Sequence, residues 1–148
     1  KRLSLIFYNN SNPSVEEIEN ELGLIREDHI FEIQNFILTG KQSALHYTIN
    51  NLLSRGCSAL SMVGVFAHFC RNAIKIKHFL SQHTPTYQIA KSVRVPQSVI
   101  KLYEIYFKQK SIQQILSALE KCQQADILLK TQKTVPEDLI VADIIHNL

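Results

Sequence analysis

The chain has 148 residues, of which 45% are hydrophobic and 20% charged, with a formal net charge of +3. This composition is typical of a globular protein with a substantial core, and the mild charge gives no general signal of nucleic-acid binding. Four Gly and four Pro are few for a sheet-rich fold, which needs many tight turns. The sequence therefore predicts one ordinary domain or two small ones, built mainly from helices.

The lack of targeting signals and the spacing of the cysteines narrow the class of protein further. We find no signal peptide and no apolar run of about 18 residues, so we expect neither export nor a membrane span. The three cysteines, Cys57, Cys70 and Cys122, lack CxxC spacing, and we expect reduced, partly buried thiols of a cytosolic protein. The only Met is Met62, which indicates a part of a longer protein.

The first 25 residues form a separate short piece. Residues 1–8 have a pattern that suits either a strand or the end of a helix. We expect Ser14 to be the N-cap of a helix, with Glu17 in the capping-box position, and we expect this helix to end near Gly23 with an acidic outer face. Dense apolar patterning begins only near residue 28, so we expect a mild boundary at residues 24–28.

Three helices are predicted next, over residues 28–40, 43–55 and 58–80. Asp28 is the expected N-cap of the first helix, and Gly56 closes the second. The third begins at Ser58 and is apolar around most of its circumference. A helix with that pattern is surrounded by several neighbours, so we expect it to be the central helix.

Residues 88–107, QIAKSVRVPQSVIKLYEIYF, have the spacing of a helix-turn-helix. Arg94 stands where such a corner favours Gly, and the second helix has only Lys101 and Lys108 as cations before Lys110. We therefore favour a packed helical corner or a protein-contact surface. The alternative is a helix-turn-helix DNA-binding regulator.

Two further helices complete the chain, which gives about eight helical segments in all. Ser111 caps a helix that runs to about residue 130. Pro136 occupies the first turn of a final helix over residues 137–147. The expected fold class is therefore all-α.

Catalytic and metal motifs are missing from the sequence: it has no GxxxxGK[ST] loop, no GxSxG and no HExxH. His68 and Cys70 are two residues apart, which places them about 200° apart around a helix. We expect no enzyme activity, no cofactor and no metal site.

Two sets of side chains are candidates for contacts with partners. A single short helix cannot bury three aromatic positions in one direction, so part of this set can face a protein partner. The alternative is that two rings lie in the core and the third is a scattered surface ring. These residues are Tyr103, Tyr106 and Phe107. A second set shares one face of the central helix and can attract phosphate, although cations also gather at helix C-termini. These residues are Arg71, Lys75 and His78.

The order of these segments resembles the C-terminal part of the bacterial DNA polymerase III delta subunit. The matching positions are Ala44, Leu45, Ile49, Leu52, Leu53 and Gly56, then Arg71, then Ile89, Ala90, Lys91 and Val95, then Ala125, Asp126, Leu129 and Lys130. The family usually has Gly before the corner valine, and Arg94 departs from this. The resemblance covers roughly residues 1–148 and is strongest from Asp28 onward.

The resemblance implies a non-catalytic part of a clamp loader, in a nucleoid-associated replication complex of the bacterial cytoplasm. Residues 1–25 would be the C-terminal remnant of a lid-like helical domain, and residues 26–148 a helical collar domain that mediates oligomerisation. The implied partners are the collar domains of the gamma or tau and delta prime subunits. The sliding clamp would be contacted by a preceding region, and DNA only indirectly.

Overall fold

The computed structural model describes residues 27–131 and 135–148, and all regular structure in these residues is helical. The helices are α3 (Glu27–Leu38), α4 (Gln42–Ser54), α5 (Ala59–Ser81), α6 (Thr86–Val93), α7 (Gln97–Gln109), α8 (Ile112–Thr131) and α9 (Glu137–Asn147). The predicted all-α bundle is confirmed. The expected lid-like piece at residues 1–25, including the open assignment of residues 1–8, lies outside the described residues.

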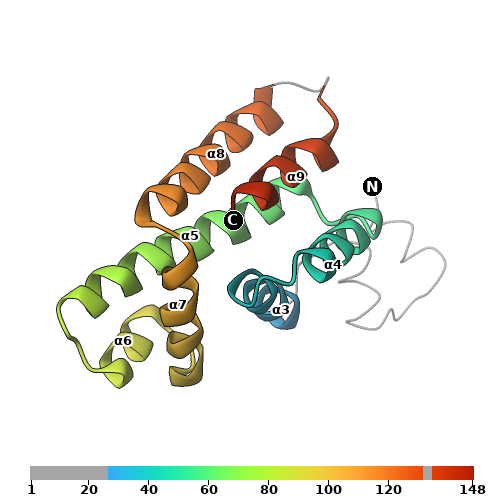
Figure 1. The fold of residues 1–148 in the computed structure, drawn as a ribbon. Coiled ribbons are helices and arrows are strands. Elements are labelled where there is room, and N and C mark those ends of the chain that lie inside the picture. Colours follow the sequence, from blue (N-terminus) through green and yellow to red (C-terminus); the bar gives the residue numbers. More distant parts are fainter. Residues whose placement is uncertain (1–26, 132–134) are drawn as a thin grey trace, which may run out of the picture.

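Helix α5 is central, as its all-round apolar pattern predicts. It packs against α6, α7, α8 and α9, and Figure 1 shows it as a long diagonal through the molecule. Phe66 and Phe69 on α5 are both fully buried. The apolar circumference of α5 thus serves four neighbouring helices.

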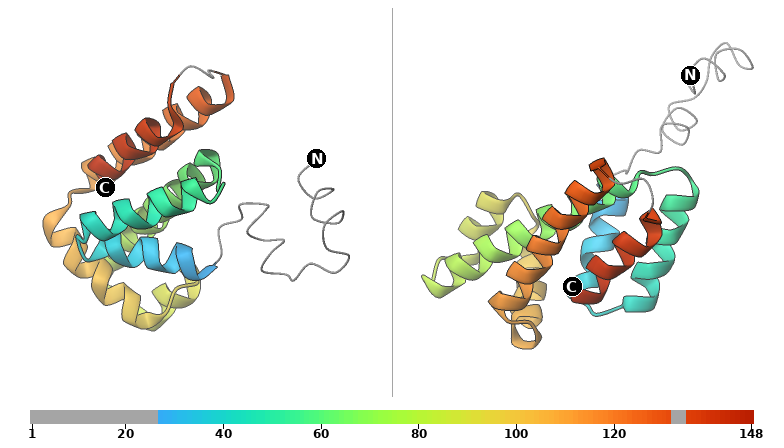
Figure 2. Two further views of the ribbon diagram at one scale, coloured as in Figure 1. Left: turned by 90° about the vertical axis from the view of Figure 1, so that its right-hand side faces the viewer. Right: turned by 90° about the horizontal axis from the view of Figure 1, so that it is seen from above.

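The helices around α5 form pairs. α8 and α9 lie side by side, as do α3 and α4, and α4 also contacts α9. α6 and α7 form the corner that the helix-turn-helix spacing predicts, and α7 also contacts α3. The two turned views in Figure 2 show these pairs gathered around α5. One hydrophobic core therefore joins all seven described helices.

Four helices end in the same backbone motif. A residue one or two positions past the end of each has a positive φ: Gly40 at 68°, Gly56 at 93°, His83 at 55° and Arg94 at 57°. In each case the following N–H bonds to a carbonyl five residues earlier, as from Val95 to Ala90 at 3.1 Å. Gly adopts this conformation without steric cost, whereas a side chain with a Cβ is strained there.

The predicted N-caps of α5 and α8 are confirmed. The N–H of Ser61 donates to Ser58 Oγ at 3.1 Å. The N–H of Gln114 donates to Ser111 Oγ at 3.2 Å, and Gln114 Oε1 accepts from the Ser111 N–H at 2.8 Å. This reciprocal pair is a capping box, which fixes where α8 begins.

Three predicted helix starts are wrong by one or two residues; α4, for example, begins at Gln42 and not at Ser43. α3 begins at Glu27, so Asp28 lies inside the helix instead of capping it. α6 begins at Thr86 and not at Gln88, because Pro85 occupies the N-cap position and Thr86 already has helical backbone geometry.

Candidate interaction surfaces

Tyr103 and Tyr106 lie in the core and not on the surface. They are 0% and 4% exposed, and both rings contact Phe69 of α5 at centroid distances of 5.7 Å. Burial raises the pKa of both phenols. Neither ring faces outward, and the two correspond to the core rings of the alternative, because α7 turns this face towards α3 and α5.

The hydroxyls of the two buried tyrosines differ in their surroundings. Tyr106 donates a buried hydrogen bond to the main-chain oxygen of Leu148 at 3.0 Å, which ties α7 to the end of α9. The Tyr103 hydroxyl is buried and has no hydrogen-bond partner among the described residues. Both phenols lie in the core, but only that of Tyr106 has a hydrogen-bond partner among the described residues.

Phe107 is half-buried and keeps part of its ring accessible. Its ring lies 5.9 Å from that of Tyr103 and 6.0 Å from that of Tyr106, measured between centroids. Lys77 Nζ of α5 lies 5.0 Å from the Phe107 centroid, a cation–π distance. Of the three candidate rings, Phe107 alone can contribute to a surface.

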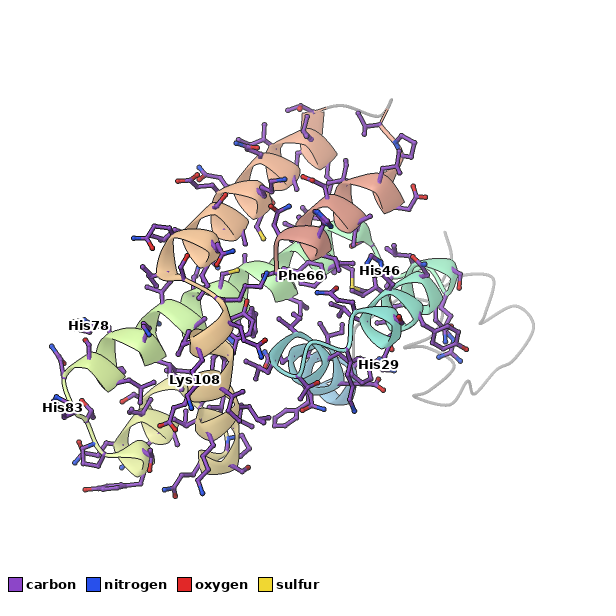
Figure 3. All side chains as sticks on the ribbon, viewed as in Figure 1. His29, His46, Phe66, His78, His83 and Lys108 are labelled. Atoms are coloured by element: carbon purple, nitrogen blue, oxygen red, sulfur yellow. The ribbon has the colours of Figure 1, made fainter. Side chains whose placement is uncertain are left out.

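Arg71, Lys75 and His78 are all exposed on α5, in agreement with their helical spacing. Figure 3 labels His78 and His83 close together at one end of the molecule, with Lys108 on α7 nearer the centre. Arg71 also lines a groove between α5 and α8. The three candidate basic residues are therefore accessible to a partner.

The groove between α5 and α8, here called the α5–α8 groove, has a volume of about 390 Å³. It is lined by Leu60, Val63, Gly64, Ala67, Arg71, Leu119, Cys122, Gln123 and Asp126. Gly64 borders open space in this groove, since a Cβ built there would meet nothing within 4 Å. Leu60 on one wall is 39% exposed, and Leu116 and Ile127 on α8 are 43% and 54% exposed.

A second groove, of about 230 Å³, lies between α8 and α9. Leu139 and Val135 are 60% and 36% exposed on its lining, and the Lys121–Asp143 ion pair lies at 2.8 Å among its lining residues. Helix α8 is therefore bordered on two sides by partly apolar hollows. Neither groove is visible in the sequence, because grooves depend on how helices pack.

The described residues contain no group of three or more His, Cys, Asp or Glu side chains that could hold a metal ion. His68 is exposed and lies 3.0 Å from Asn72 Nδ2, whereas Cys70 is buried, so these two do not converge. The three cysteines are free and buried. A hydrogen bond with Cys122, together with burial, raises the pKa of Cys70.

No helix in the described part of the chain is both long enough and apolar enough to cross a membrane. What the described residues do offer is an all-α bundle with two hollows beside α8 and exposed apolar side chains along them. Such surfaces are typical of domains that bind other proteins.

The family model of the DNA polymerase III delta subunit, C-terminal domain, matches residues 27–145. The chain therefore belongs to this family, and its role is that of a clamp-loader component in DNA replication. No curated protein and no solved structure matches the chain. This membership assigns the α6–α7 corner to a replication protein in place of a helix-turn-helix regulator.

Proposed function

We propose that this chain acts as the collar domain of the delta subunit. In this role it joins the collar domains of the gamma or tau and delta prime subunits, within the cytoplasmic complex that opens and loads the sliding clamp. The domain performs no chemistry itself. The clamp is contacted by a region that precedes this domain. In this assembly role the domain is linked to DNA only indirectly, through the rest of the complex. The family match over residues 27–145 is the observation that carries the proposal.

The α5–α8 groove is the best candidate for the contact with a neighbouring subunit. Its lining includes Leu60, which is 39% exposed, and α8 also exposes Leu116 and Ile127. Arg71 and Asp126 contribute polar groups to the lining. An apolar centre with polar groups around it is the usual composition of a protein–protein interface.

Gly64 allows a direct test, because a larger side chain there enters the groove without displacing the fold. We expect Gly64→Leu to fill the groove and to weaken binding to the gamma and delta prime collar domains on the order of ten-fold or more. Gly64→Ala is the matched control: it adds one methyl group and should bind nearly as the unsubstituted chain does. Isothermal titration calorimetry measures all three.

Two unfavourable outcomes have different meanings. If Gly64→Leu binds as tightly as Gly64→Ala, the interface lies elsewhere on the domain. If the unsubstituted chain binds neither collar domain, the assembly role itself is wrong.

A further inference from the structure

The positive charge of the chain is concentrated in one segment. Residues 71–110 contain eight Lys or Arg and one Glu, a formal charge of +7, whereas the whole chain carries +3. The rest of the chain is therefore acidic, at −4. The eight cations are Arg71, Lys75, Lys77, Lys91, Arg94, Lys101, Lys108 and Lys110.

In the fold these residues occupy the C-terminal half of α5 together with α6 and α7, which we call the basic end. Figure 1 shows this part in the lower left, below the pair α8 and α9. His78 and His83 lie at the same end, as labelled in Figure 3. The cations that are concentrated in residues 71–110 of the sequence are therefore also close together in the fold.

The charges of the basic end are exposed and uncompensated. Seven of the eight cations are exposed, and Lys110 is half-buried. None of them forms an ion pair with a described residue; the ion pairs in the described part belong to Lys121 and Lys130 of α8. Lys91 and Arg94 lie at the C-terminal end of α6, and Lys108 and Lys110 at that of α7, so attraction to helix dipoles accounts for four of the eight.

The N-termini of α6 and α7 meet within the basic end. Gln97 Nε2 of α7 donates to Thr86 Oγ1 of α6 at 2.8 Å, which joins the first residues of the two helices. Both helices follow a proline, and neither is capped by a side chain. The positive ends of two helix dipoles are therefore added to the local cations, which favours an anion at this point.

The side chains around this junction are of the types that contact nucleic acids. Tyr87 is 61% exposed and lies one helical turn from Lys91 on the same face of α6. Lys101 lies one turn from Gln97 on α7. Lys and amide side chains bind phosphate and sugar oxygens, and exposed aromatic rings stack on bases.

We propose that the basic end binds a polynucleotide through its phosphate backbone, independently of base sequence. This contact is direct and does not rest on the proposed assembly role. A nucleic acid is favoured over an acidic protein because the cations extend over three helices and are accompanied by an exposed ring and by two uncapped helix N-termini. Sequence-specific reading is not implied, since the aromatic face of α7 is turned into the core.

The test is fluorescence anisotropy of a labelled oligonucleotide titrated with the 148-residue chain over a series of salt concentrations. Duplex and single-stranded oligonucleotides of equal length form two arms, and the tighter one identifies the strand form. We expect a Kd within about 10⁻⁴–10⁻⁶ M that weakens steeply with salt, because each phosphate contact releases counterions.

Two double variants locate the contact. Lys91→Gln with Lys101→Gln removes two charges from the basic end. Lys41→Gln with Arg55→Gln removes two exposed charges at the two ends of α4, outside the basic end. The first pair should weaken binding on the order of ten-fold and lower the salt slope by roughly 2, while the second should change binding little. Circular dichroism confirms that both variants remain helical.

Three results would overturn the proposal. One is the absence of binding to either oligonucleotide at low salt, at protein concentrations of about 10⁻⁴ M. The second is an equal loss of affinity in both double variants. The third is tighter binding to polyglutamate than to either oligonucleotide, which would assign the basic end to an acidic protein.

Discussion

Arg94 turns the chain between α6 and α7 with a left-handed backbone, at φ 57°. The Val95 N–H completes the turn by bonding to the Ala90 carbonyl at 3.1 Å, so the motif forms although the residue carries a Cβ. The left-handed conformation costs a residue with a Cβ roughly 1 kcal/mol. Arg94 is also the residue that departs from the family pattern, in which Gly is usual. The structure shows that this departure costs conformational free energy.

Replacing Arg94 by Gly should therefore stabilise the domain by about 1 kcal/mol, because Gly adopts positive φ without strain. Lys101→Gly is the control: it removes the same charge from the interior of α7 and should destabilise by about 1 kcal/mol through lost helix propensity. Urea unfolding measures both. A loss of stability in Arg94→Gly would show that the side chain contributes more than its backbone strain costs.

The two buried tyrosines form a natural matched pair. Tyr106→Phe removes the hydrogen bond to Leu148 and leaves a buried oxygen without this donor, so we expect a loss of about 1–2 kcal/mol. Tyr103→Phe removes a buried hydroxyl that has no described partner, so we expect no loss or a small gain. Equal losses in urea unfolding would contradict this difference.

Stability should also fall in alkali because of these phenols. Burial raises the pKa of Tyr103 and Tyr106 above the ordinary value of about 10, so the folded chain keeps two protons that the unfolded chain releases. Their contribution is complete below about pH 10 and is lost as the pH rises further. The free energy of unfolding, measured between about pH 9 and 11, should decline more steeply for the natural chain than for the double Phe variant.

At the scale of the helix, Gly64 and Gly40 both border open space but differ in backbone conformation. A Cβ at either position would meet nothing within 4 Å, but only Gly40 has a positive φ, of 68°. Gly64→Ala should stabilise α5 by about 1 kcal/mol, whereas Gly40→Ala should destabilise the end of α3 by a similar amount. Thermal melting compares the two, and a shift of the same sign in both would contradict the argument.

Most helices were predictable from sequence because their ends carry explicit signals. Ser58 and Ser111 cap helices as their side chains indicate, and Gly40 and Gly56 end helices where Gly is expected. The errors occur at the starts of α3, α4 and α6, where the observed starts are Glu27, Gln42 and Thr86. None of these residues directly follows a Ser or Thr that could have marked the boundary.

The orientation of helix faces was less predictable. The spacing of Ile100, Tyr103 and Phe107 is that of a buried stripe, and this signal could have placed Tyr103 in the core. For Tyr106 the spacing is ambiguous, and its burial depends on Leu148, 42 residues away. The α5–α8 groove was likewise invisible, since it arises where Gly64 of one helix faces a neighbour distant in sequence.

At the scale of the whole molecule, the net charge of +3 does not show that the positive charge is concentrated in one segment. Acidic residues elsewhere offset most of the +7 carried by residues 71–110. A charge sum taken along the chain could have revealed the segment, but only the fold shows that α5, α6 and α7 gather it at one end. Most of these cations lie outside the lining of the α5–α8 groove, so the two contacts proposed above share only Arg71.

The most direct test of the account is the mass of the particle formed when the chain is mixed with the gamma and delta prime collar domains. Size-exclusion chromatography with light scattering measures it, at concentrations of about 10⁻⁵ M, where interfaces of ordinary affinity are occupied. We predict one peak that contains this chain and has the summed mass of the joined collar domains. Separate elution of this chain at its own mass of 17.0 kDa would contradict the central claim.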